Sequence, residues 1–130
     1  MVTAVVDTSG LYALLDGDDL HHAAAVGIWD ALSEVDLVAH AYVVTESLAL
    51  TRARLGWSAT VALIDLVLPA IRVEMVERDV HDAALSEHRT LAGGTSFVDR
   101  VTIAFARQND ITGCFGFDRD LEAAGLKRLS

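Results

Sequence analysis

Four widely separated carboxylates are the residues best suited to carry chemistry: Asp7, Glu46, Asp99 and Asp118. Such side chains repel one another when folding brings them together, unless positive residues or metal ions neutralise their charge. Hard divalent cations prefer oxygen ligands, and a bound Mg²⁺ or Mn²⁺ ion lowers the pKa of a water placed against a phosphodiester. Convergence of the four acids therefore predicts a metal-dependent hydrolytic site that needs no side-chain nucleophile.

Each aspartate also has an ordinary structural interpretation, because Asp accepts hydrogen bonds from free amides at a helix start. Asp7 could cap the helix that follows it, and Asp118 could cap a helix over residues 119–124. Asp99 lies three residues after Ser96, which is the spacing of a capping box. Glu46 differs because apolar neighbours flank it, and a partly buried carboxylate needs a cation or a proton.

Further polar residues near these acids are secondary candidates. The hydroxyls of Thr8 and Ser96 could hold a water or a phosphate, with local capping bonds as the alternative. Arg100 could contact a phosphate or point to solvent. Asp120 could aid the metal site through a water, or respond to the helix dipole. Residues 18–22, DDLHH, resemble a metal cluster, but a solvated turn and helix start is the favoured interpretation.

The charge balance limits how the chain could bind nucleic acid. A formal net charge of −9 at pH 7 argues against binding by bulk electrostatics, because an acidic surface repels polyphosphate. Positive charge could still border an acidic centre. Five arginines lie close in sequence to the last three acids: Arg52, Arg54, Arg100, Arg107 and Arg119.

The elements that must position these residues alternate between strand and helix. The pattern predicts a strand that ends at Val6, strands over 35–39, 71–76 and 111–117, and a short edge strand at 126–129. It predicts helices over 10–15, 23–32, 42–55, 58–68 and 96–108, and a further helix that begins at Asp79. Parallel strands need such helical connections. We therefore expect a three-layer α/β/α domain with a mainly parallel sheet of four or five strands, and ligands outside the carboxyl ends of its strands.

Composition bounds the class of protein. With 130 residues, of which 52% are hydrophobic, the chain is expected to form one domain over residues 1–130. No apolar stretch reaches the length of a membrane helix, and no secretory signal is visible, so we expect a cytoplasmic protein with no membrane contact. The single cysteine, Cys114, is expected to be a buried, inert thiol.

The order of the acidic segments gives a more specific indication. Residues 5–15, VVDTSGLYALL, then 43–46, VVTE, then 96–99, SFVD, and finally 117–121, FDRDL, resemble the ordered motifs of PIN domains. The resemblance covers essentially the whole chain and is strongest to VapC-type toxins of toxin–antitoxin pairs.

This resemblance implies a metal-dependent endoribonuclease, carried by Asp7, Glu46, Asp99 and Asp118 with Mg²⁺ or Mn²⁺ as cofactor. It also implies a homodimer and a small VapB-like antitoxin that covers the acidic site. Two departures stand out. Gly116 replaces the Thr or Ser of many relatives, and Arg100 follows Asp99 where a small residue is more usual.

Functions of other classes remain as alternatives. A housekeeping PIN-domain RNA-processing nuclease would use identical chemistry, and a neighbouring antitoxin gene would separate the two. A non-catalytic PIN-like binding module is disfavoured because all four acids are retained. A haloacid-dehalogenase-like phosphotransferase with Asp7 as nucleophile is disfavoured too, because Ser9 occupies the place of its second aspartate and Lys127 is the only lysine.

Overall fold

A five-stranded, entirely parallel sheet forms the centre of the computed structural model, which describes residues 1–130. Its strands are β1 (Val2–Val6), β2 (Val35–His40), β3 (Arg72–Glu74), β4 (Gly113–Phe115) and β5 (Lys127–Arg128), arranged in the order β3-β2-β1-β4-β5. β1 lies in the middle, with Val5 opposite Val38 of β2 and Cys114 of β4. All five strands run in the same direction, so their carboxyl ends lie at the same edge of the sheet.

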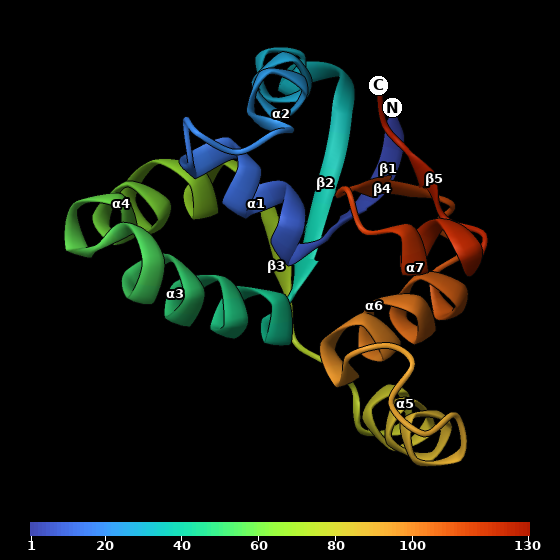
Figure 1. Cartoon of the computed structure of the whole chain (residues 1–130). Helices are drawn as coiled ribbons and strands as arrows, with labels where there is room; N and C mark the ends of the chain where they lie inside the picture. Colours follow the sequence, from blue (N-terminus) through green and yellow to red (C-terminus); the bar gives the residue numbers. More distant parts are fainter.

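Helices cover both faces of this sheet (Figure 1). One face carries α1 (Thr8–Leu15), α2 (His22–Asp30), α3 (Ala41–Leu55) and α4 (Trp57–Ala62), which continues through a π-helical stretch, Leu63–Val67, into the 3₁₀ turn Leu68–Ala70. The other face carries α5 (Arg78–Thr90), α6 (Phe97–Gln108) and α7 (Arg119–Ala123). The expected three-layer α/β/α architecture is confirmed.

Two hydrophobic cores follow from the alternation of side chains along each strand. Ala4 and Val6 of β1 pack with Phe115 against the layer of α1 to α4. Val5, between them, packs with Val38 against α5, α6 and α7. The central strands β1 and β4 contribute to both cores because helices bury both faces of the sheet, as is usual for parallel sheets.

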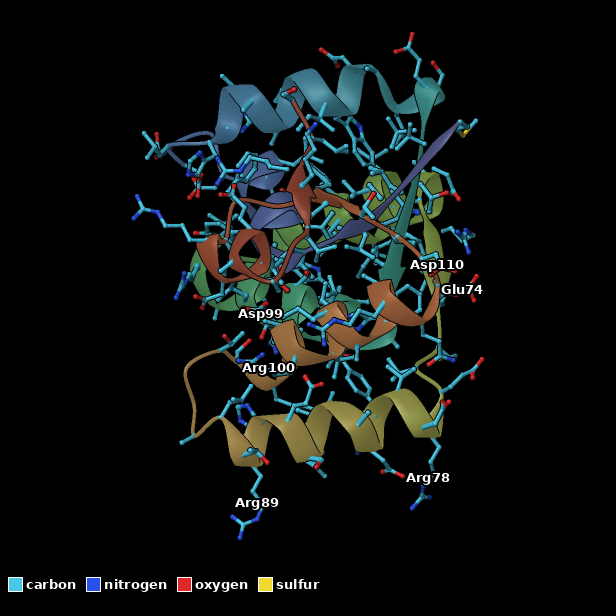
Figure 2. The ribbon with its side chains drawn as sticks, turned by 90° about the vertical axis from the view of Figure 1, so that its right-hand side faces the viewer. Glu74, Arg78, Arg89, Asp99, Arg100 and Asp110 are labelled. Atoms are coloured by element: carbon cyan, nitrogen blue, oxygen red, sulfur yellow. The ribbon has the colours of Figure 1, made fainter.

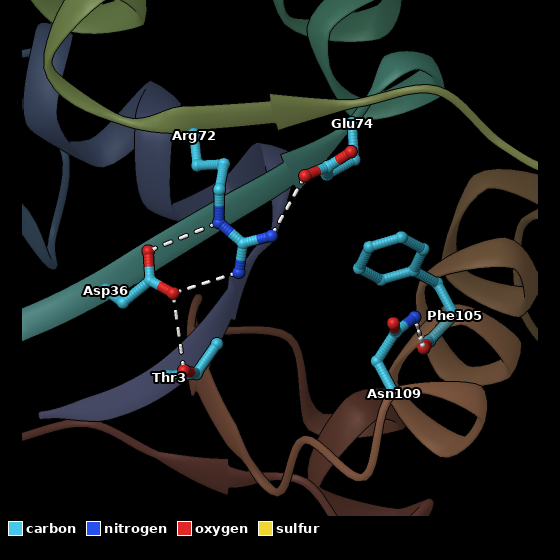
Figure 3. A network of polar contacts seen from close by, with 6 residues as sticks. All are labelled: Thr3, Asp36, Arg72, Glu74, Phe105 and Asn109. Carbon is cyan, nitrogen blue, oxygen red and sulfur yellow. Dashed lines mark hydrogen bonds and ion pairs between the residues drawn. The ribbon is translucent and has the colours of Figure 1, made fainter.

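An ion-pair network holds the edge strand β3 onto the sheet (Figure 3). The guanidinium of Arg72 lies 2.9 Å from the carboxylates of both Asp36 and Glu74, and Asp36 also accepts a hydrogen bond from the Thr3 hydroxyl. The hydrogen bond from Arg72 lowers the pKa of Asp36. The side chains of three adjacent strands are thus linked across the sheet.

Close packing beside β4 depends on a residue without a side chain. A Cβ atom at Gly10 of α1 would lie 2.4 Å from the carbonyl oxygen of Phe115. Only glycine lets α1 approach β4 this closely, and this approach sets where the start of α1 lies relative to the end of β4. None of the helices combines the length and apolar character needed to cross a membrane.

Candidate metal centre

Asp7 lies directly after β1 and caps α1. Its Oδ2 accepts hydrogen bonds from the backbone N–H of Ser9, at 3.2 Å, and from the Ser9 hydroxyl. Its Oδ1 is buried and has no hydrogen-bond partner, and the residue is only 2% exposed. A buried carboxylate oxygen without a partner is costly unless a cation binds it. Asp7 is therefore oriented through one oxygen and leaves the other for a ligand.

Asp99 and Asp118 come from two further helix starts. Asp99 is in the first turn of α6, where its N–H donates to the Oγ of Ser96 at 3.1 Å, and it is 7% exposed. Figure 2 shows Asp99 and Arg100 at the start of this helix. Asp118 caps α7 by accepting the N–H of Asp120 at 2.8 Å. The capping interpretation thus holds for Asp7 and Asp118, and it does not prevent them from converging.

The carboxylates of Asp7, Asp99 and Asp118 meet outside the carboxyl ends of β1 and β4. One oxygen from each lies within 4.8 Å of the others. Burial, followed by the neighbouring charge of Asp7 and the carboxylate of Asp118, raises the pKa of Asp99 to about 8. Three carboxylates this close favour a shared proton or a divalent cation. The donor set and the unpartnered Oδ1 of Asp7 both fit a hard cation such as Mg²⁺ or Mn²⁺.

Glu46 stands apart from these three acids. It lies in the second turn of α3, half-buried, and lines the same cavity, but its carboxylate is outside the three-aspartate cluster. The structure therefore brings three of the four expected acids together and places the fourth, Glu46, on the wall of the cavity.

The cavity around this centre has a volume of about 410 Å³ and is lined mostly by polar residues. Two of the secondary candidates, Thr8 and Ser96, line it, and the buried hydroxyl of Thr8 has no hydrogen-bond partner. Two others do not line it. Arg100 donates to the Thr95 hydroxyl at 3.3 Å, and Asp120 is exposed on α7.

One of the five arginines named from the sequence, Arg54, lines the cavity. Six further lining residues were not singled out as site residues: Ser9, Tyr12, Asp19, His21, Leu50 and Phe117. The ring of His21 stacks on Phe117 with 4.4 Å between centroids and an interplanar angle of 1°. Residues 17–21 form the expected turn and His22 begins α2, and from this turn Asp19 and His21 also line the cavity. No local pattern signals this contact, because it joins two distant loops.

Gly116, the first departure from the PIN pattern, lies against Asp7. A Cβ atom at this position would lie 2.6 Å from the Cβ of Asp7 and 3.2 Å from the Oγ of Ser9. The Ser9 hydroxyl also accepts the N–H of Phe117 at 2.8 Å. A hydroxyl thus contacts Asp7 here, but α1 supplies it rather than position 116.

Two buried titratable residues near the sheet belong to the interior. His40 caps α3 through Nδ1, and its Nε2 lies 2.8 Å from the Thr102 hydroxyl. Burial lowers the pKa of His40 to about 4, so the ring is neutral at pH 7. Cys114 is a free, buried thiol as expected, and burial raises its pKa.

Comparisons with known proteins agree with this architecture. Residues 4–127 match the model of the PIN domain family. The structure is similar to VapC20 of Mycobacterium tuberculosis, a sarcin-ricin loop cleaving toxin, with a TM-score of 0.82, 30% sequence identity and 95% of both chains covered.

Two more distant solved structures share the fold. DNA-bound VapBC from Salmonella typhimurium has a TM-score of 0.69 at 9% identity, covering 99% of this chain and 98% of that one. FitAcB from Neisseria gonorrhoeae has a TM-score of 0.67 at 18% identity, covering 98% and 96%. No curated protein sequence matches the chain. The family-model match, which spans nearly the whole length and includes all four acidic segments, shows that the chain belongs to the PIN domain family.

Proposed function

We propose that this protein is a metal-dependent endoribonuclease and the toxin of a VapBC-type toxin–antitoxin pair. The observation that carries the proposal is the convergence of Asp7, Asp99 and Asp118 within 4.8 Å, with a buried oxygen of Asp7 left unpartnered. A centre of this kind suits a hard divalent cation and a phosphodiester substrate.

The three aspartates would hold the ion, which we expect to be Mg²⁺ or Mn²⁺. When bound, the ion supplies acidity to an attacking water and stabilises the charge that develops on the leaving oxygen. The chain itself supplies orientation. Ser9 fixes the carboxylate of Asp7, and the backbone N–H of Asp120 fixes the carboxylate of Asp118. The Ser96 hydroxyl fixes the backbone at Asp99. Glu46 faces the cavity from α3, where it can orient a water or accept its proton.

The relatives guide the choice of substrate and partner. VapC20, at 30% identity, is a sarcin-ricin loop cleaving toxin, which makes a sarcin-ricin loop hairpin the first RNA to test. The similarity to VapBC supports a small VapB-like antitoxin as partner. We also propose that the chain works as a homodimer in the cytoplasm. A basic antitoxin segment would complement the net charge of −9.

Cleavage of the hairpin RNA by purified protein tests the proposal. Wild-type protein is expected to cut in the presence of Mg²⁺ or Mn²⁺ and to stop when EDTA is added. Asp7→Asn is expected to remove cleavage while leaving the circular dichroism spectrum and cooperative unfolding intact. Mapping RNA 5′ ends after brief expression in cells identifies the natural target. Full activity of Asp7→Asn would reject the assignment of the centre.

A further inference from the structure

One stripe of α3 extends the cavity away from the three aspartates. Glu46, Leu50 and Arg54 follow one another at the spacing of one helix face, and all three line the cavity. Arg54 therefore lies a little over two turns beyond Glu46, roughly 12 Å along the helix axis. Arg54 thus contributes to the wall of the same cavity at a position well beyond Glu46.

Arg54 is the only lysine or arginine that lines this cavity. Arg72, Arg78, Arg107 and Arg128 are all held in ion pairs on other parts of the surface, whereas no carboxylate lies within ion-pair distance of Arg54. Figure 2 shows Arg78 and Arg89 at opposite ends of α5, away from Asp99. No direct ion pair with a carboxylate therefore neutralises the positive charge of Arg54.

An aromatic ring holds this guanidinium at the cavity. The guanidinium carbon of Arg54 lies 5.8 Å from the ring centroid of Tyr12, and Tyr12 itself lines the cavity from α1. A guanidinium on an aromatic face keeps its edge N–H groups free for a planar partner such as phosphate. The pair Tyr12–Arg54 therefore presents donors to whatever enters from this side.

The acidic residues that line the cavity make a positively charged contact to the RNA backbone favourable. Asp19 and Glu46 line the wall, and their charge repels a phosphate backbone that passes the aspartate centre. From this arrangement we infer that Arg54, positioned by Tyr12, binds a phosphate of the RNA strand next to the one that is cut. This inference rests on the proposed endoribonuclease function and extends it to a specific backbone contact.

The chain provides a matched control on the same helix. Arg52 is also exposed and outside every ion pair, but it does not line the cavity, because residues two apart on a helix point roughly 200° apart. Arg54→Gln and Arg52→Gln therefore remove the same charge from opposite faces of α3. The two variants separate a local contact from a change in net charge.

Binding is measured with a fluorescent RNA that contains the mapped cleavage site, using the Asp7→Asn background so that no cutting occurs. Arg54→Gln is expected to weaken binding about fivefold, as for an exposed charge contact. It is also expected to reduce the slope of log affinity against log salt by about 0.7, the value for one phosphate of a single strand. Arg52→Gln is expected to bind like its parent.

RNAs in which one flanking phosphate is replaced by an uncharged methylphosphonate locate the contact. One such position is expected to weaken the Asp7→Asn parent about fivefold, as for an exposed charge contact, and to cause no further loss when Arg54→Gln is added. Equal behaviour of Arg54→Gln and Arg52→Gln, or additive losses at every position, would overturn the inference. If wild-type protein cuts no RNA, the proposed function itself fails, and the two failures are thereby distinguished.

Discussion

The hydroxyl of Ser9 donates a hydrogen bond to Oδ2 of Asp7, two residues earlier, and accepts the N–H of Phe117 at 2.8 Å. One hydroxyl thus joins the segment after β1 to the segment that leads to Asp118. Because Asp7 and Asp118 belong to the same three-aspartate cluster, Ser9 fixes the separation of two candidate ligands.

Ser9→Ala is expected to loosen this arrangement. The loss of two hydrogen bonds from a half-buried hydroxyl lowers the free energy of unfolding by about 1 to 2 kcal/mol. Cleavage activity is expected to fall about tenfold or more, because the orientation of Asp7 is lost. Urea unfolding and initial rates measure both. The matched change, Ser86→Ala on the exposed face of α5, should alter neither, and equal effects of the two would show that Ser9 has no special role.

Gly116→Ser introduces the hydroxyl that many PIN relatives carry, but this chain has no space for it. The new Cβ would lie 2.6 Å from that of Asp7, so the loop or Asp7 must move. We expect a loss of about 1 to 3 kcal/mol of stability together with reduced metal affinity. Gly27→Ala in α2, where nothing lies within 4 Å, is expected to stabilise the protein by about 0.5 to 1 kcal/mol instead. Thermal unfolding with and without Mn²⁺ measures both changes, and improved metal binding by Gly116→Ser would contradict the expected clash.

The sequence predicted the fold because hydrophobic periodicity reports which faces are buried. The short strands were less predictable at their ends. Strand 71–76 was expected, but β3 is Arg72–Glu74, because an edge strand is defined only where β2 pairs with it. Strand 111–117 was expected, but β4 is Gly113–Phe115, paired with β1 and β5.

The acids of the centre were predictable for a different reason. Asp7 and Asp118 follow strands whose parallel ends share one edge, so their proximity follows from topology. The sequence did not predict that His21 lines the cavity, because its stack on Phe117 depends on the path of two loops. Nor did it separate Arg54 from Arg52, since only the packing of α3 decides which one faces the cavity.

Glu46→Gln tests the difference between Glu46 and the three aspartates. Because its carboxylate lies outside the cluster, we expect metal affinity to change less than about tenfold, while activity falls about 10- to 100-fold, as for residues that act beside the ion. Asp99→Asn is expected to lose metal binding altogether. Mn²⁺ titration followed by thermal shift compares the two variants. Equal loss of Mn²⁺ binding in both variants would show that Glu46 binds the metal ion directly, as the aspartates do.

His40 is expected to make the protein sensitive to mild acid. Burial lowers its pKa to about 4 in the folded protein, whereas an unfolded histidine titrates near 6.5. Between these values the unfolded chain binds the additional proton, so the stability from this residue is complete above about pH 6.5 and declines as the pH falls toward 4. The full contribution of this titration to the free energy of unfolding is on the order of 3 kcal/mol.

Urea unfolding from pH 8 to pH 4.5 tests this expectation. The free energy of unfolding is expected to decline less steeply with falling pH for His40→Gln than for wild type. Comparing slopes rather than absolute stabilities separates this titration from the lost packing and the lost contact with Thr102, which lower stability at every pH. Parallel curves for the two proteins would show that His40 is not held neutral by its burial.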